Sequence, residues 1–282
     1  MRALVIPILL WIAVLPVIAS GIEVSGDVWG VWSPVNNPYE VVGELRVPPE
    51  STLVIEPGVF VNFQGHYKFI VDSLATLLAV GAETDSIYFT TDDTATGWHG
   101  IRFLYADDNS QITYSCLEYG KATGDGHDRN GGAIYCYYSG AAVRNNTISH
   151  NHASSYGAGV YCSYSSISID NNVITDNRAY SHGGGVHADN STVTISSNVI
   201  SGNVGRCGGG VYCSGSNARI SNNTISANTA TSLWGGDGGG MSCWSCDLTV
   251  TNNTIIENRA EDGSGGIGCL YTDGTISGNT IR

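Results

Sequence analysis

The chain has 282 residues, of which 37 are glycine and only 13% are charged. Its formal net charge of -13 at pH 7 argues against nucleic acid and anionic lipid as partners, and leaves neutral partners or divalent cations such as Ca²⁺. A glycine-rich composition of this kind disfavours a helical protein and favours a β-rich structure with many tight turns.

Residues 1–20 have the pattern of an export signal. Arg2 is the only charged residue among them, an apolar run follows from Ala3 to Ile18, and small residues close the segment. An uncleaved signal anchor is the alternative, but the apolar run is short for a membrane-spanning helix. We therefore expect a mature chain that is secreted or displayed on the outer cell surface, as a monomer with no membrane span.

The repeats begin after a less regular region. Residues 21–46 show no coil pattern and are predicted to form an N-terminal cap. Segments 52–63, 69–80, 87–90 and 97–103 then alternate apolar and polar residues, as β-strands do. These segments are the predicted first coils of a repeat domain that spans residues 47–282.

An Asn-x-Ile triplet recurs at steps of 25 to 30 residues in the second half of the chain, which is the mark of a repeat protein. The triplets begin at Asn146, Asn172, Asn198, Asn223, Asn253 and Asn279. A glycine-rich motif lies between them, as GGAIYC at 131–136 and GGGVYC at 208–213. Each unit holds three short alternating runs, so the sequence predicts an all-β solenoid with three strands per coil.

Equivalent positions of successive units are apolar, which predicts that they stack inside the solenoid. One such column is Val143, Ile169, Ile195, Ile220, Val250 and Ile276. The asparagines are predicted to hydrogen-bond the backbone at corners of the coil rather than a ligand. The last unit stops at Arg282 without a polar cap, and we expect the sequence to be a piece of a longer chain.

These residues resemble a known class of proteins. Residues 38–71, DSIYFTT at 85–91 and GWHGIRF at 97–103 are similar to the opening coils of bacterial secreted right-handed β-helix repeat proteins. The GGAIYC-type units resemble repeats of the polymorphic outer-membrane protein family, and the pectin-lyase-like superfamily shares this architecture. The resemblance implies a single-stranded right-handed parallel β-helix, a fold that carries lyases, hydrolases, adhesins and passive scaffolds alike.

Two insertions are predicted at one corner, at residues 121–130 and 229–237. The first holds Asp125, His127 and Asp128, and a histidine flanked by carboxylates is suited to bind a divalent metal or to act as a base. The alternative is a pair of polar, solvent-facing turns. Further residues expected along this edge are His152, Arg178, His182, Arg206, Trp234 and Asp237.

An aromatic stripe is predicted on the outside of one sheet. Its members alternate with inward residues of the glycine-rich units, with two more tyrosines nearby; they are Tyr135, Tyr161, His187 and Tyr212, and then Tyr138 and Tyr164. Aromatic faces suit stacking with sugar rings. The alternative is an aromatic ladder that only stabilises the sheet. Arg144 and Asp170 are expected to form a surface ion pair on adjacent coils.

A cysteine column is predicted inside the solenoid. It reads Cys136, Cys162, Ala188, Cys213, Cys243 and Cys269. The alanine indicates a slot for small apolar residues, which favours buried thiols over a metal site, and disulfides between adjacent coils remain the alternative.

The expected function is a non-catalytic extracellular scaffold that binds a polysaccharide or cell-surface glycan through the aromatic stripe, Trp234 and the corner insertions. No cofactor is evident, although Ca²⁺ is compatible with the charge. A polysaccharide lyase or glycoside hydrolase acting at 121–130 is the first alternative. The set of carboxylate, His and Arg-x-Lys motifs typical of polygalacturonases is absent, which disfavours it. A purely structural stalk is the second alternative.

Overall fold

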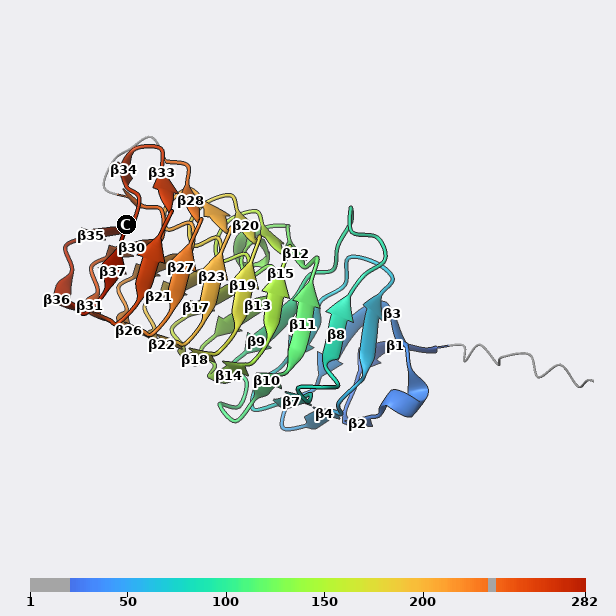
Figure 1. Cartoon of the computed structure of the whole chain (residues 1–282). Helices are drawn as coiled ribbons and strands as arrows, with labels where there is room; N and C mark the ends of the chain where they lie inside the picture. Colours follow the sequence, from blue (N-terminus) through green and yellow to red (C-terminus); the bar gives the residue numbers. More distant parts are fainter. Residues whose placement is uncertain (1–20, 233–236) are drawn as a thin grey trace, which may run out of the picture.

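The computed structural model describes residues 21–232 and 237–282. The chain winds into a stack of coils, and equivalent strands lie side by side along the whole length of the molecule (Figure 1). A regular coil consists of β13 (Ile134–Tyr137), β14 (Ala141–Arg144) and β15 (Thr147–Ser149). Each strand pairs in parallel with its equivalent in the next coil, which confirms the predicted three-stranded coil.

Three long rows of parallel strands therefore form the sides of the solenoid, and we call them the first, second and third sheets. The first and third are joined at one end, where β3 (Tyr39–Val47) pairs with a strand of each. The first holds β6 (Phe69–Val71), β9 (Ile101–Leu104), β13, β17 (Val160–Ser163), β21 (Val186–Asp189), β25 (Val211–Ser214), β30 (Met241–Trp244) and β35 (Ile267–Leu270). The second holds β2 (Gly30–Trp32), β4 (Thr52–Ile55), β7 (Thr76–Val80), β10 (Gln111–Thr113), β14, β18 (Ser166–Asp170), β22 (Thr192–Ser196), β26 (Asn217–Ser221), β31 (Asp247–Thr251) and β36 (Asp273–Ser277). The third holds β5 (Phe60–Phe63), β8 (Ile87–Thr90), β11 (Ser115–Glu118), β15, β19 (Val173–Thr175), β23 (Val199–Ser201), β27 (Thr224–Ser226), β32 (Thr254–Ile256) and β37 (Thr280–Ile281).

The predicted apolar columns form the core. Val143 is in register with Ile169, and Cys136 with Cys162, and these side chains are fully buried. Leu117 lies between Phe89 and Ile148 in another such column. The repeat spacing thus predicted the register correctly because each inward position must meet its own equivalent on the next coil.

Both asparagine columns form continuous hydrogen-bonded ladders. The Oδ1 atom of Asn172 accepts from the backbone N–H of Asn146 at 2.9 Å and from its side-chain amide at 3.0 Å, and the same pattern links Asn198 to Asn172. The prediction of a structural role at the corner between the second and third sheets is confirmed. The second ladder, through Asn151 and Asn177, lies at the next corner.

The glycine-rich motif follows from crowding at the start of each first-sheet strand. Gly208 has a φ of +58°, and a Cβ atom there would lie 2.3 Å from the carbonyl oxygen of Val211. Only glycine fits such a position.

Two features were absent from the predictions. A minor sheet of two-residue strands follows the third corner, formed by β12 (Lys121–Ala122), β16 (His152–Ala153), β20 (Arg178–Ala179), β24 (Val204–Gly205), β28 (Thr229–Ala230) and β33 (Arg259–Ala260). A serine ladder lies at the first corner, where Ser165 Oγ accepts from the N–H of Ser139 and Ser191 Oγ from that of Ser165. Segments of two residues are too short to show the alternation of apolar and polar residues by which strands are recognised in a sequence.

Residues 21–46 also differ from the expectation of a cap without coil strands. β1 (Ile22–Asp27) pairs with β3 (Tyr39–Val47), and β2 pairs with β4, so this region forms the terminal rung of the same sheets. Trp32 stacks on Tyr39 with ring centroids 4.5 Å apart and helps to cover that end of the core. The strands of residues 21–46 could not be recognised from the sequence because they lie before the regular repeats and share none of their motifs.

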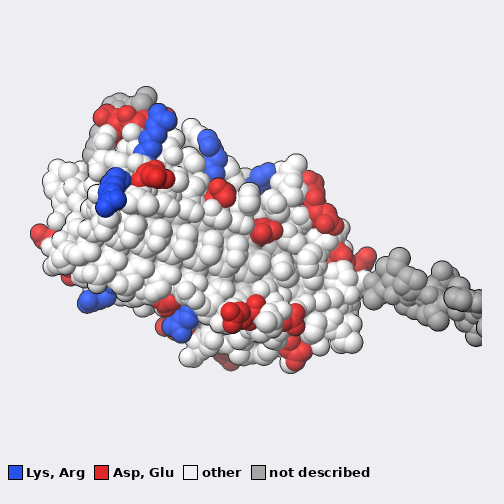
Figure 2. Space-filling view, viewed as in Figure 1, with Lys and Arg blue, Asp and Glu red and all other residues white. Residues whose placement is uncertain are grey.

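The outer surface is sparsely charged. Figure 2 shows a broad uncharged area, with Lys, Arg, Asp and Glu side chains gathered mainly toward its edges. Over the described part of the chain, no helix is long and apolar enough to cross a membrane.

Candidate ligand-binding surface

The predicted aromatic stripe exists as a stacked ladder on the outer side of the first sheet. The aromatic ladder consists of Tyr135, Tyr161, His187 and Tyr212, which are in register on successive strands. Ring centroids lie 5.3 Å apart between Tyr135 and Tyr161, 5.2 Å between Tyr161 and His187, and 4.9 Å between His187 and Tyr212. The ladder is therefore continuous over four coils.

The expectation that this ladder forms an open, flat face is wrong. The exposed fraction of its members is only 1% for Tyr135, 5% for Tyr161, 4% for His187 and 7% for Tyr212. Side chains of the third corner fold over it: the ring of Tyr156 lies 4.9 Å from that of His187, and His182 stacks on Tyr212 at 4.6 Å. The aromatic ladder is therefore largely covered by neighbouring side chains and is not open to solvent.

A hollow of about 250 Å³ remains above part of this floor. It is lined by Tyr156, Tyr161, His182, His187, Asp189, Tyr212, Ser214 and Trp244. Burial, with a smaller effect of His182, lowers the pKa of His187 to about 3, so this imidazole is neutral at physiological pH. Trp244, whose side chain is half exposed, offers an accessible ring at the rim.

The three candidate residues of the 121–130 corner do not share one set of contacts. This corner contains the short helix η2 (Gly126–Arg129), on which His127 is exposed and packs its ring 5.3 Å from that of Tyr137. Asp128 instead bonds the ammonium group of Lys68 at 2.8 Å and lies 3.9 Å from the buried His99. Asp125 is exposed. Within residues 21–232 and 237–282, no group of three or more His, Cys, Asp or Glu is placed to hold a metal ion.

The second insertion is only partly described. Trp234 lies outside the described residues. Asp237 begins the short strand β29 (Asp237–Gly238), which pairs with β34 (Gly263–Ser264). Of the other residues expected along this edge, His152 and Arg178 are adjacent in the minor sheet.

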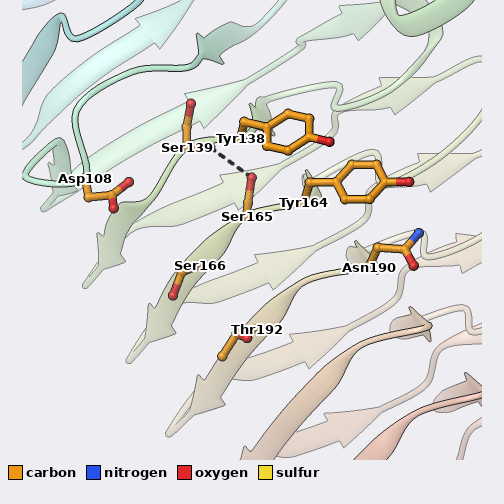
Figure 3. Close-up of a pocket in the computed structure, with 8 residues that line it drawn as sticks. All are labelled: Asp108, Tyr138, Ser139, Tyr164, Ser165, Ser166, Asn190 and Thr192. Carbon is orange, nitrogen blue, oxygen red and sulfur yellow. Dashed lines mark hydrogen bonds between the residues drawn. The ribbon is translucent and has the colours of Figure 1, made fainter.

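A more exposed aromatic group lies at the first corner, between the first and second sheets. This tyrosine corner consists of Tyr105, Tyr138 and Tyr164, whose exposed fractions are 51%, 47% and 49%. The rings are nearly parallel, with centroids 5.3 Å apart for Tyr105 and Tyr138 and 5.0 Å apart for Tyr138 and Tyr164. Figure 3 shows the last two rings side by side and pointing the same way.

Open hollows flank this stack along the long axis. One of about 450 Å³ is lined by Asp108, Tyr138, Ser139, Tyr164, Ser165, Ser166, Asn190 and Thr192 (Figure 3). The other, of about 540 Å³, lies on the far side of Tyr138 beside Leu74 and Tyr105. The surface thus combines aromatic rings with hydroxyl and amide groups.

The backbone at these tyrosines is in a conformation that such residues rarely adopt. The φ angles of Tyr105, Tyr138 and Tyr164 are 55°, 47° and 49°. The same corner of the following coils uses Asn190, Gly215, Ser245 and Tyr271, which also have positive φ. The left-handed backbone is therefore a property of this corner of the coil and not of the three tyrosines alone.

Two other predicted features agree with the structure. The guanidinium Nε of Arg144 lies 3.3 Å from a carboxylate oxygen of Asp170, which confirms the surface ion pair. Cys136, Cys162, Cys213 and Cys243 of the predicted cysteine column are buried thiols in this structure, whereas Cys269, its last member, is an exposed thiol.

Comparison with known proteins gives a match of family but not of function. The family model described as "Right handed beta helix region" matches residues 99–281. No curated protein and no solved structure matches the chain.

Proposed function

We propose that this chain, which belongs to the family of right-handed β-helix proteins, is a non-catalytic scaffold that binds a glycan at the tyrosine corner. The export pattern of residues 1–20 supports a place outside the cell, in the secreted fraction or on the cell surface. The hollow at Trp244 and the aromatic ladder is a second part of the same aromatic surface, reached over the first sheet.

The observation that carries this proposal is the exposed stack of Tyr105, Tyr138 and Tyr164. Its ring spacing of 5.0 to 5.3 Å follows the coil repeat. An extended glycan advances by a similar step from one sugar to the next. A chain running along the solenoid would therefore meet the edge and hydroxyl group of an equivalent tyrosine at each sugar, because the ring faces pack against one another. Short side chains such as Ser166 and Thr192 lose little conformational entropy when they bond sugar hydroxyls.

The ligand best suited to this corner is a neutral polysaccharide. The carboxylate of Asp108 lines both hollows, and neither hollow has a lysine or arginine among its lining residues. With a net charge of -13 on the chain, an acidic polysaccharide would be repelled.

Affinity electrophoresis of the mature protein in gels with neutral or acidic polysaccharides tests the proposal. We expect retardation by at least one neutral polysaccharide and no release of reducing ends or unsaturated uronates, with or without Ca²⁺. Tyr138→Ala and Tyr164→Ala should lose most of the retardation. Tyr271→Ala is the matched control, because Tyr271 has the same positive φ and is 79% exposed but belongs to no tyrosine stack among the described ring contacts.

Three outcomes would overturn this assignment. Retardation that survives both substitutions would place binding elsewhere. Cleavage of any polysaccharide would favour a lyase or hydrolase and direct mutagenesis to residues 121–130. No retardation by any polysaccharide would favour a purely structural stalk.

A further inference from the structure

A third hollow lies beneath the 121–130 corner and differs in character from those beside the tyrosine corner. Its volume is about 280 Å³. Aliphatic and aromatic side chains form most of its wall; its lining residues are Lys68, Ile70, Arg102, Leu104, Tyr105, His127, Asp128, Tyr135 and Tyr137. The 121–130 corner contributes His127 and Asp128 to this wall, so we call the site the apolar hollow.

The apolar hollow carries an excess of positive charge. Its described lining contains two cations, Lys68 and Arg102, and one carboxylate, Asp128. Lys68 bonds Asp128 at 2.8 Å, and its own side chain is 26% exposed and open to solvent. The charge of Arg102 therefore has no carboxylate of its own in the lining, on a chain whose overall charge is -13.

Arg102 is held by neutral groups. Its guanidinium donates to the backbone carbonyl oxygens of Asn130 at 2.6 Å and of His127 at 2.8 Å, and lies 4.0 Å above the ring centre of Tyr135. Burial lowers the pKa of Arg102 to about 10, so it remains protonated at neutral pH. Carbonyl groups and an aromatic face satisfy its N–H donors without cancelling the charge.

These features define the chemistry of a ligand. The apolar wall suits a flat, apolar body, and the volume limits that body to about one ring with a short substituent. The excess positive charge suits an anion. A sugar acid fits poorly, because the carbonyl oxygens of His127 and Asn130 already accept from Arg102 and sugar hydroxyls buried beside Ile70 and Leu104 would lack partners.

We propose that the apolar hollow binds a small aromatic carboxylic acid. The ring packs among Ile70, Leu104 and Tyr137, and the carboxylate lies at the rim, where it shares Lys68 with Asp128. The charge of Arg102 offsets the repulsion between the two carboxylates. This site adjoins the glycan surface of the tyrosine corner, because Tyr105 borders both, but the residues proposed to hold the ligand, Lys68, Ile70 and Leu104, line only the apolar hollow.

Titration calorimetry with benzoate as the probe tests this proposal on the mature protein. Benzyl alcohol serves as the neutral analogue and glucuronate as the sugar acid. We expect saturable binding of benzoate at one site, about tenfold tighter than that of benzyl alcohol, since a charge-assisted hydrogen bond contributes about that factor. Lys68→Met should remove this preference, and Lys121→Met, on the same corner but outside the lining, should keep it.

Leu104→Trp provides an independent check, because it fills the apolar hollow and leaves the ion pair of Lys68 and Asp128 in place. It should abolish benzoate binding and leave retardation by polysaccharide unchanged. The proposal is overturned if benzoate gives no saturable heat, if benzyl alcohol binds equally well, if glucuronate binds more tightly than benzoate, or if Leu104→Trp binds benzoate like the unmodified chain.

Discussion

The amide oxygen of Asn177 accepts two hydrogen bonds from Asn151, one coil away: from its backbone N–H at 3.0 Å and from its side-chain amide at 2.9 Å. The amide group of Asn177 donates in turn to the carbonyl oxygen of Ile148 at 2.9 Å and to Oδ1 of Asn203 at 3.0 Å. One buried side chain therefore bonds polar groups of both neighbouring coils.

Asn177→Ala should consequently be among the most destabilising single substitutions. It leaves buried donors and acceptors of Asn151 and Ile148 without partners, and we expect a loss of about 3 kcal/mol in the free energy of unfolding. Urea denaturation followed by circular dichroism measures it. Asn217→Ala, at an exposed position of β26, is the control and should change stability by less than about 0.5 kcal/mol. Equal effects of the two would contradict the role of the ladder.

Gly208→Ala should destabilise the fold far more than Gly126→Ala. Both glycines have positive φ, 58° and 57°, but a Cβ at position 208 meets a carbonyl oxygen at 2.3 Å, whereas nothing lies within 4 Å of one at position 126. Placing alanine in the left-handed backbone costs about 1 kcal/mol in both variants. Only Gly208→Ala also suffers the steric clash with the carbonyl oxygen. Melting temperatures of the two proteins should differ by several degrees, and matching values would refute the crowding argument.

Stability should fall in acid partly through His187. Its folded-state pKa of about 3 lies below the usual value of 6.5, so the unfolded chain binds a proton more readily, and stability is lost as the pH falls from about 6.5 toward 3. His187→Tyr copies the residue of both neighbouring coils and removes this group. We expect the unfolding free energy of the variant to decline less between pH 7 and pH 4, by on the order of 2 kcal/mol. Parallel pH profiles would show that His187 is not responsible.

The cysteines of the column should differ sharply in reactivity. Cys136, Cys162 and Cys213 are fully buried, and burial raises the pKa of Cys162 to about 12, whereas Cys269 is exposed. In the native protein, iodoacetamide should modify Cys269 and spare the other three, as peptide mass spectrometry will reveal. Denaturation without reductant should make all four react. Continued protection of Cys136 and Cys162 after denaturation would indicate a disulfide between them.

The part of the fold that repeats could be predicted from the sequence. Columns such as Val143 to Ile276 can be recognised from the sequence because stacking brings equivalent positions of successive coils together. The corner role of Asn172 follows from its place between two alternating runs. The shape of the ligand-binding surface did not follow from periodicity. Nothing in the spacing indicates that Tyr156 and His182 fold over the aromatic ladder, since the path of a corner segment depends on its own packing.

The tyrosine corner could also be predicted only in part from the sequence. Tyr138 and Tyr164 could be recognised as part of an aromatic group, but Tyr105 belongs to a less regular coil and was missed. The apolar hollow joins Lys68 to Asp128 across 60 residues, and no local motif relates them. A contact of this kind depends on how coils of unequal length align, which the strict repeat does not specify.

The ladder of regular coils also has a consequence for the reach of the molecule. Between Asn146 and Asn228, the side chains of the two asparagine ladders bond only within their own coil or to an adjacent one, and each coil advances the rod by roughly 4.8 Å. Loss of residues 178–203 would place Val204 after Asn177 in the register that it already occupies. The rod would become one step shorter. The stack of Tyr105, Tyr138 and Tyr164 would remain, and residues of the next coil would take the places of Asn190 and Thr192 beside it. The length of this part of the solenoid can therefore change by whole coils without altering the coils at either end.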